Sequence, residues 1–117
     1  MKTFGLGLVG CGGMGRSLAV SANQIGTLKL NTNEKTDSTS VAVKVISVCD
    51  TNPSLSKKLS QDIGSEMTTN YLDLLEDSRI NAILIATPPF LHKSIAVDSA
   101  TAGKHVFTEK PMATSLV

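Results

Sequence analysis

The chain has 117 residues, a formal net charge of +1, 41% hydrophobic residues and 18% charged residues. This composition predicts one globular domain and excludes a disordered chain, a coiled coil and collagen. The charge balance gives no reason to expect nucleic acid or a membrane surface as a partner, and no apolar run approaches the roughly 18 residues of a membrane-spanning helix. Because two cysteines make no disulfide framework, we expect a reduced, cytoplasmic protein.

The first predicted elements are a buried strand and a helix with one apolar face. Residues 4–9 are apolar or glycine throughout, which is typical of a strand buried on both faces of a parallel sheet. Apolar side chains then recur at the spacing of an α-helix, and we expect them to face the core. These positions are Met14, Leu18, Ala22 and Ile25. Gly26 is expected to end this helix.

A polar segment, Thr27–Ser40, interrupts the pattern before the second strand. It is rich in Thr, Asn and Ser and cannot pack a core, so we expect a surface insertion with a short hairpin strand at Leu28–Leu30. A contact loop is the functional alternative for this segment. The β-branched run Val41–Val48 then predicts a second strand, which ends at Cys49 and Asp50.

The rest of the chain repeats this alternation of strand and helix. Asn52 and Pro53 predict a helix start, and Gly64 predicts its end. The expected apolar face of this helix consists of Leu55, Leu59 and Ile63. The remaining predicted elements are a strand at 66–68, a helical turn at 71–75 capped by Asn70, a strand at 82–86, a helix at 91–102 with Ile95, Ala96 and Ser99 on its narrow face and Gly103 at its end, and a strand at 105–108. Strands that alternate with helices predict a single α/β domain, residues 1–117, with a doubly wound parallel sheet.

A G-x-G-x-x-G motif occupies residues 10–15, directly after the first predicted strand and at the start of the first helix. In this context Gly10 permits a tight turn, Gly12 lets the backbone approach a pyrophosphate, and Gly15 lets the helix pack closely on its strand. A diphosphate would lie on the free N–H groups at the helix start, where the helix dipole favours negative charge. The alternative is a glycine-rich turn without a ligand.

An acidic residue at the end of the second strand is the second requirement of a dinucleotide site, because it accepts hydrogen bonds from the adenosine ribose. Asp50 has this place, and the polar segment explains why it follows Gly15 by 35 residues instead of roughly 20. Glu34 and Asp37 are nearer the usual interval, but no strand precedes them. A carboxylate at Asp50 would repel a 2′-phosphate, which favours NAD over NADP. A cap of the following helix is the structural alternative for Asp50.

Three motifs follow one another along the chain. They are the glycine turn continued as Met14-Gly15-Arg16, the segment Ala86-Thr87-Pro88-Pro89-Phe90-Leu91-His92, and the segment Ala102-Gly103-Lys104-His105-Val106-Phe107-Thr108-Glu109-Lys110-Pro111. In this order they resemble the N-terminal Rossmann domain of the Gfo/Idh/MocA oxidoreductases, the relatives of glucose–fructose oxidoreductase and inositol 2-dehydrogenase. The resemblance implies an NAD(P)-binding domain of a dehydrogenase that transfers a hydride between a nicotinamide cofactor and a sugar, cyclitol or related polyol.

The resemblance also assigns site residues position by position. The residues matched to cofactor binding are Gly10, Gly12, Gly13, Met14, Asp50, Ala86, Thr87, Pro88, His92, Glu109 and Lys110. Lys110 is also matched to a catalytic lysine, whose ammonium would stabilise the negative charge that develops on a carbinol oxygen as the hydride leaves. Without the family match, a solvated surface lysine is the simpler interpretation of Lys110.

Other reactive residue types have simpler structural interpretations. Cys11 and Cys49 are expected to be small buried thiols, in preference to a redox pair or a metal site. With two separated histidines, no metal-ligand pattern emerges. Arg16 either favours phosphate or forms a salt bridge on the helix surface. We expect His105 to be structural and Tyr71 to pack against the sheet.

In the family, a second α/β domain follows and supplies an Asp and a His that complete the catalytic site, whereas this sequence stops at Val117. We therefore expect the 117 residues to bind NAD, to turn over a sugar or polyol substrate poorly, and to form homo-oligomers through exposed apolar surface. A non-catalytic nucleotide-binding or sensing module is the first alternative. A methyltransferase that uses S-adenosylmethionine is a more distant one.

Overall fold

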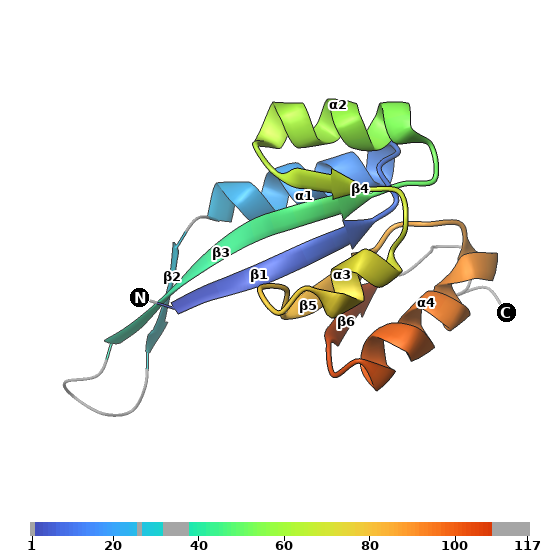
Figure 1. The fold of residues 1–117 in the computed structure, drawn as a ribbon. Helices are drawn as coiled ribbons and strands as arrows, with labels where there is room; N and C mark the ends of the chain where they lie inside the picture. Colours follow the sequence, from blue (N-terminus) through green and yellow to red (C-terminus); the bar gives the residue numbers. More distant parts are fainter. Residues whose placement is uncertain (1, 26, 32–37, 109–117) are drawn as a thin grey trace, which may run out of the picture.

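The computed structural model describes residues 2–25, 27–31 and 38–108, which form an α/β fold (Figure 1). In chain order the elements are β1 (Lys2–Val9), α1 (Gly13–Ile25), β2 (Thr27–Asn31), β3 (Ser38–Cys49), α2 (Pro53–Ile63), β4 (Glu66–Thr68), α3 (Leu72–Glu76), β5 (Ala82–Ile85), α4 (Pro89–Thr101) and β6 (His105–Thr108). The predicted alternation of strands and helices is confirmed. The expected helix end at Gly26 and the motif residues Glu109, Lys110 and Pro111 lie outside the described residues.

Within the described residues, the strands form a six-stranded sheet in the order β2-β3-β1-β5-β6, with β4 paired to β3. The central strand β1 pairs in parallel with β3 on one side and with β5 on the other. Strands β4 and β6 continue the sheet in the same direction, whereas β2 runs antiparallel to β3. The parallel strands have the order of a Rossmann sheet, so the predicted fold class is confirmed. Because these strands point the same way, their carboxyl ends meet at one edge.

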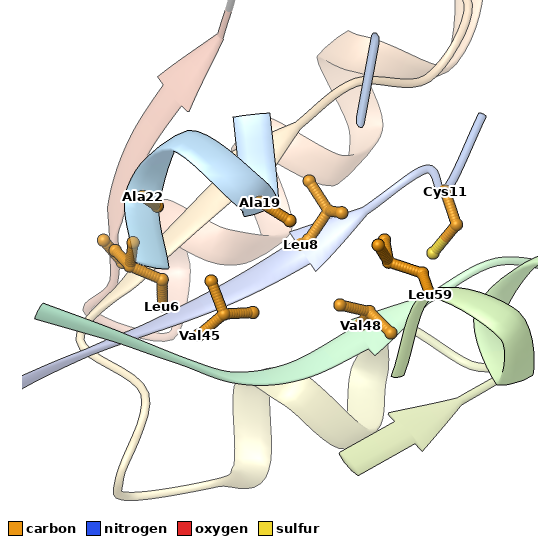
Figure 2. Close-up of a cluster of buried hydrophobic side chains, with 9 residues drawn as sticks. Leu6, Leu8, Cys11, Ala19, Ala22, Val45, Val48 and Leu59 are labelled. Carbon is orange, nitrogen blue, oxygen red and sulfur yellow. The ribbon is translucent and has the colours of Figure 1, made fainter. Parts of the chain in front are cut away.

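Helices cover both faces of this sheet (Figure 1). Helices α1 and α2 pack on one face, where Ala19 and Leu59 join a buried cluster with Leu8 of β1 (Figure 2). Helices α3 and α4 contribute Leu74 and Ile95 to a second buried cluster. The chain therefore crosses to one face after β1 and to the other after β5, although these strands are neighbours in the sheet.

The buried face of α1 is made of small residues, not of the larger ones that the apolar spacing predicts. Its buried positions are Gly15, Ala19 and Ala22. Met14 is 54% exposed and Ile25 is 50% exposed, so the prediction was wrong for both. A Cβ on Gly15 would lie 1.7 Å from the Gly10 carbonyl oxygen, so α1 begins in close contact with the backbone, and further along it the small side chains of Ala19 and Ala22 join the buried cluster (Figure 2).

Local residues at the ends of α2, α3 and α4 explain where these helices begin or end. The Asn52 side chain accepts a hydrogen bond from the N–H two residues on, at 3.0 Å, and Gly64 ends α2 with a φ of 74°. Asn70 accepts a corresponding bond at the start of α3, at 3.0 Å. Helix α4 begins at Pro89, before the predicted Leu91, because proline is well suited to the first helical turn. In the described ranges, none of these helices combines the length and apolar character that crossing a membrane requires.

The segment expected to be a polar surface insertion, Thr27–Ser40, contains more β structure than predicted. Strand β2 confirms the short hairpin strand and is longer than expected, with Thr27 opposite Ala42 and Asn31 opposite Ser38. Residues 38–40 begin β3, so this strand starts three residues before the predicted Val41. The pairing satisfies backbone groups that a loop would leave to water, and Figure 1 shows the two strands as an arm beside the body of the sheet.

Candidate functional site

A cleft of about 510 Å³ opens at the carboxyl edge of the sheet. It lies where β1 and β5 end and where the following helices, α1 and α4, diverge to opposite faces. In open α/β sheets, ligands bind in the crevice at this kind of divergence. The lining residues come from the ends of four strands and from the segments that follow them: Val9, Gly10 and Gly12 at the end of β1 and beyond; Cys49, Asp50, Thr51 and Leu55 at the end of β3 and beyond; Thr69, Asn70 and Tyr71 after β4; and Ala86, Thr87, Pro88, Leu91, Ser94 and Ile95 after β5.

The glycine turn after β1 combines close packing with open space. Gly10 has a φ of 103°, a left-handed conformation that other residues rarely adopt, and a Cβ there would lie 2.7 Å from the Ala86 carbonyl oxygen. A Cβ on Gly15 would lie 1.7 Å from the Gly10 carbonyl oxygen. At Gly12 and Gly13, however, a Cβ would meet no described atom within 4 Å. The protein's own packing therefore requires Gly10 and Gly15, whereas Gly12 and Gly13 leave the start of α1 open.

The Asp50 carboxylate accepts a hydrogen bond from the backbone of the glycine turn. Its Oδ2 accepts a hydrogen bond from the Cys11 N–H at 2.8 Å, and its Oδ1 accepts one from the Asn52 N–H at 2.8 Å. The Gly10 N–H also donates to the Cys49 carbonyl at 2.8 Å. Asn52, not Asp50, caps α2, so the capping alternative for Asp50 is not what the structure shows. Each carboxylate oxygen has a further lone pair, so Asp50 can also accept a hydrogen bond from a ligand.

The turn after β5 forms the wall beside the glycine turn. The Ala86 N–H donates to the Val9 carbonyl at 2.8 Å, which continues the contact between β1 and β5 beyond the end of β5. Thr87 and Pro88 follow and also line the cleft. Among the described residues, the Thr87 hydroxyl is buried and has no hydrogen-bond partner. A buried polar group without a hydrogen-bond partner lowers stability by about 1–3 kcal/mol, and in this turn that group lies beside the cleft.

A further wall, which the sequence did not reveal, joins the β4–α3 turn to α4. Tyr71 lines the cleft, and its hydroxyl donates a hydrogen bond to the Asp98 carboxylate on α4. This bond is the main reason that the pKa of Tyr71 is raised. Tyr71 also packs against the second buried cluster, as expected. The position of this turn after a parallel strand could have indicated that it lines the cleft, but nothing in the sequence indicates the contact with Asp98.

Helix α2 contributes a residue to the cleft lining that the sequence pattern placed in the core. Leu55 lines the cleft and is 39% exposed, although its spacing predicted a place in the core. The fully packed positions of this helix are Ser56, Leu59 and Ser60. The buried face of α2 is therefore made of these three residues, and Leu55 lies beside it at the cleft.

The structure brings together a subset of the predicted cofactor residues. Those that line the cleft are Gly10, Gly12, Asp50, Ala86, Thr87 and Pro88. Gly13 and Met14 begin α1 next to the turn without lining the cleft. His92 also lies off the lining, and its Nε2 is 2.5 Å from the Thr87 carbonyl oxygen. Glu109 and Lys110 lie outside the described residues.

The remaining reactive groups near the cleft are held in protein contacts. Burial, followed by the negative charge of Asp50, raises the pKa of the Cys11 thiol to about 12 and that of the Cys49 thiol to about 11. Both are buried thiols, as expected, and they belong to clusters on opposite faces of the sheet. Arg16 forms an ion pair with Asp62 of α2. In the part of the chain that the structure describes, no group of three or more His, Cys, Asp and Glu side chains could hold a metal ion.

Comparison with known proteins gives a consistent match over the whole chain. A family model described as the oxidoreductase family with an NAD-binding Rossmann fold matches residues 4–117. Levoglucosan dehydrogenase from Pseudarthrobacter phenanthrenivorans is 32% identical over 116 residues, which are 97% of this chain and 27% of that protein. The chain therefore spans about a quarter of the length of this relative.

In solved structures too, nearly the whole of this chain matches less than a third of the longer protein. The WlbA dehydrogenase from Bordetella pertussis, in complex with NADH and UDP-GlcNAcA, superimposes with a TM-score of 0.76 and 30% identity over 97% of this chain and 30% of that chain. Apo scyllo-inositol dehydrogenase from Lactobacillus casei gives a TM-score of 0.74 and 25% identity over 95% of this chain and 29% of that chain. These proteins share the overall arrangement of strands and helices described above.

Proposed function

Because this chain belongs to the Gfo/Idh/MocA oxidoreductase family, within its NAD-binding Rossmann domain, we propose that its cleft binds NAD. We propose further that it serves an oxidoreductase that transfers a hydride between the nicotinamide and a sugar, cyclitol or related polyol. The observation that carries the proposal is the hydrogen bond from the Cys11 N–H in the glycine turn to the Asp50 carboxylate. It brings the backbone N–H groups of the turn and an acidic side chain to one cleft.

The residues present fit the parts of a dinucleotide. At the start of α1, the first N–H groups have no partner within the helix, and the missing side chains at Gly12 and Gly13 leave room for a diphosphate to reach them. Asp50 can accept hydrogen bonds from ribose hydroxyls and would repel a 2′-phosphate. Leu55, Leu91 and Ile95 give the cleft an apolar surface on which a base can pack.

The bound nicotinamide would accept or return the hydride, and the chain would orient it and exclude water. The Lys110 ammonium is proposed to hydrogen-bond the substrate carbinol oxygen and to stabilise its negative charge. This assignment rests on the Glu109-Lys110-Pro111 motif of the family resemblance. The class of substrate rests on relatives that act on levoglucosan and scyllo-inositol.

We propose that the 117 residues in isolation bind the cofactor without completing the reaction. The support is the coverage, since the chain matches 27% of levoglucosan dehydrogenase and 29% of scyllo-inositol dehydrogenase. Contributions from the rest of those proteins would then be needed for turnover. Assay of the chain with NAD across a panel of sugars and cyclitols tests this point, and measurable turnover would contradict it.

Titration of the chain with NADH, with S-adenosylmethionine as the competing ligand, tests the proposed cofactor. NADH fluorescence should change saturably, and S-adenosylmethionine should not displace it. Tight binding of S-adenosylmethionine in place of NADH would overturn the proposal and favour the methyltransferase alternative. A sensing module would bind NADH equally well, so it is distinguished in the whole oxidoreductase, where Lys110→Ala should lower kcat only if the protein is an enzyme.

A further inference from the structure

The side chain of His92, on α4, contacts the turn that follows β5. The His92 side chain belongs to the first part of α4 and is partly buried. Its Nε2 lies 2.5 Å from the carbonyl oxygen of Thr87, the middle residue of this turn, which consists of residues 86–88. A carbonyl oxygen can only accept, so Nε2 carries the proton of this hydrogen bond. His92 itself is not among the residues that line the cleft.

Two other features restrict the backbone of the same turn. Thr87 precedes two prolines, Pro88 and Pro89, which fix their own φ and restrict the backbone of the residue before them. The Ala86 carbonyl oxygen lies where a Cβ on Gly10 would be only 2.7 Å away, so the turn also packs directly against the glycine turn. A small movement of the 86–88 backbone would therefore change the shape of the cleft.

The Thr87 hydroxyl is the polar group of this turn for which the described residues provide no hydrogen-bond partner. It is buried and without a partner among the described residues, which is an unfavourable arrangement for a polar group. The hydrogen bond to the Thr87 carbonyl and the following prolines restrict the backbone that carries this hydroxyl.

We propose that His92 is a positioning residue, which fixes the 86–88 wall of the cofactor cleft by donating a hydrogen bond from Nε2 to the Thr87 carbonyl. The inference rests on the proposed function, because it takes NAD as the ligand of this cleft. It assigns His92 an indirect part in binding: the side chain acts on the cofactor through the backbone of Thr87 and Pro88. The required feature is a side-chain N–H at the place of Nε2, not the aromatic ring or its charge.

The test compares NADH affinity in the full 117-residue chain with and without that donor. His92→Leu removes the N–H and should weaken NADH binding by about two- to tenfold, the range expected for one hydrogen bond. His92→Gln places an amide N–H near the same point and should restore most of the lost affinity. Val97→Ala, at an exposed position of the same helix, is the control and should bind as the unchanged chain does.

Equal affinity of His92→Leu and the unchanged chain would overturn the proposal, and so would a Gln variant as weak as the Leu variant. Because His92→Leu could fail to fold, the unchanged chain provides a second test. Long-range ¹H–¹⁵N NMR of the imidazole should show His92 protonated at Nε2, with slower proton exchange than exposed His105. Protonation at Nδ1 alone would contradict the hydrogen bond. If the unchanged chain bound no NADH, the proposed function would fail, while the NMR result would still decide whether His92 holds the turn.

Discussion

The backbone N–H of Cys11 donates a hydrogen bond of 2.8 Å to the carboxylate of Asp50, 39 residues further along the chain. This contact joins the turn after β1 to the end of β3, so the glycine motif and the acid belong to one local structure. It also gives Asp50 two tasks, since the carboxylate holds the turn and faces the cleft. Replacement of Asp50 should therefore affect both the shape of the turn and the choice of cofactor.

Two glycines of the same motif should respond differently to alanine. At Gly15 the new Cβ would lie 1.7 Å from a backbone oxygen, so α1 must move and Gly15→Ala should lose about 1–3 kcal/mol of unfolding free energy or more. At Gly12 a Cβ meets no described atom within 4 Å, so Gly12→Ala should remain as stable as the unchanged chain within about 0.5 kcal/mol. Its NADH affinity should nevertheless fall at least about tenfold, because the methyl group occupies space at the helix start.

Urea denaturation and NADH titration of both glycine variants check this pair of expectations. The deciding measurement is the free energy of unfolding for Gly15→Ala and the NADH affinity for Gly12→Ala. If Gly12→Ala bound NADH normally, the diphosphate would not lie at this turn. If Gly15→Ala were fully stable, the close packing of α1 would be incorrect.

The contact between Tyr71 and Asp98 should stabilise the fold by joining two walls of the cleft. Tyr71→Phe removes the hydroxyl and should lower the unfolding free energy by about 0.5–1.5 kcal/mol. A double-mutant cycle with Asp98→Ala, measured by urea denaturation, isolates the contact from other effects of each change. Strictly additive losses would mean that the two side chains do not interact.

The surface ion pairs of Arg79 should make stability depend on acid pH. Arg79 binds Glu66 at 2.7 Å and Asp77 at 2.6 Å, and its hydrogen bonds lower the pKa of both carboxyl groups. A lowered pKa in the folded state means that the stabilisation is present above the unfolded pKa, about 4, and is lost as pH falls through the folded values. Arg79→Gln should therefore have a lower Tm than the unchanged chain at neutral pH.

At acid pH, below the lowered pKa values of both carboxyl groups, the Tm difference for Arg79→Gln should nearly vanish. Arg79→Lys keeps the charge and should lie between the two chains at neutral pH. Thermal melts at both pH values measure the effect. A Tm difference that stays the same from neutral to acid pH would show that the ion pairs are not its cause.

The thiols of Cys11 and Cys49 should be unreactive in the folded chain. With pKa values raised to about 12 and about 11, and with both side chains buried, the thiolate is scarce at neutral pH. Labelling with a chromogenic disulfide reagent should be slow in buffer and complete within the mixing time in urea. Fast labelling of either thiol in buffer would show that the region around Asp50 opens readily.

Sequence patterns predicted the fold because each strand and helix has a local signal. The strands predicted at 82–86 and 105–108 and the capped helix start at Asn52 could be recognised without knowledge of their neighbours in the fold. The buried face of α1 could not be predicted from apolar spacing, since the distance between helix and sheet decides whether Met14 or Ala19 is inside. The β-hairpin within Thr27–Ser40 was underestimated for a related reason: backbone pairing with a neighbouring strand compensates for polar side chains.

For the site, the motifs predicted the contributions of Gly10, Gly12 and Asp50, which the structure brings to one cleft. They did not predict Tyr71 or Leu55, because those positions depend on how α3 and α2 pack. The motif histidine, His92, was assigned to cofactor binding. It is not among the residues that line the cleft, and its side chain contacts the carbonyl oxygen of Thr87, which is. Contacts between segments distant in the chain decide such details, and no single segment carries a signal for them.

The central claim is that the cleft between the glycine turn and Asp50 holds NAD, and a titration of the 117-residue chain and of Asp50→Ala with NADH and NADPH tests it most directly. The unchanged chain should bind NADH saturably and prefer it to NADPH. Asp50→Ala should bind NADH at least about tenfold more weakly, through loss of its hydrogen bonds to ribose and to the turn, and its preference for NADH should shrink. Absence of NADH binding to the unchanged chain, or equal affinity and preference in Asp50→Ala, would contradict the claim.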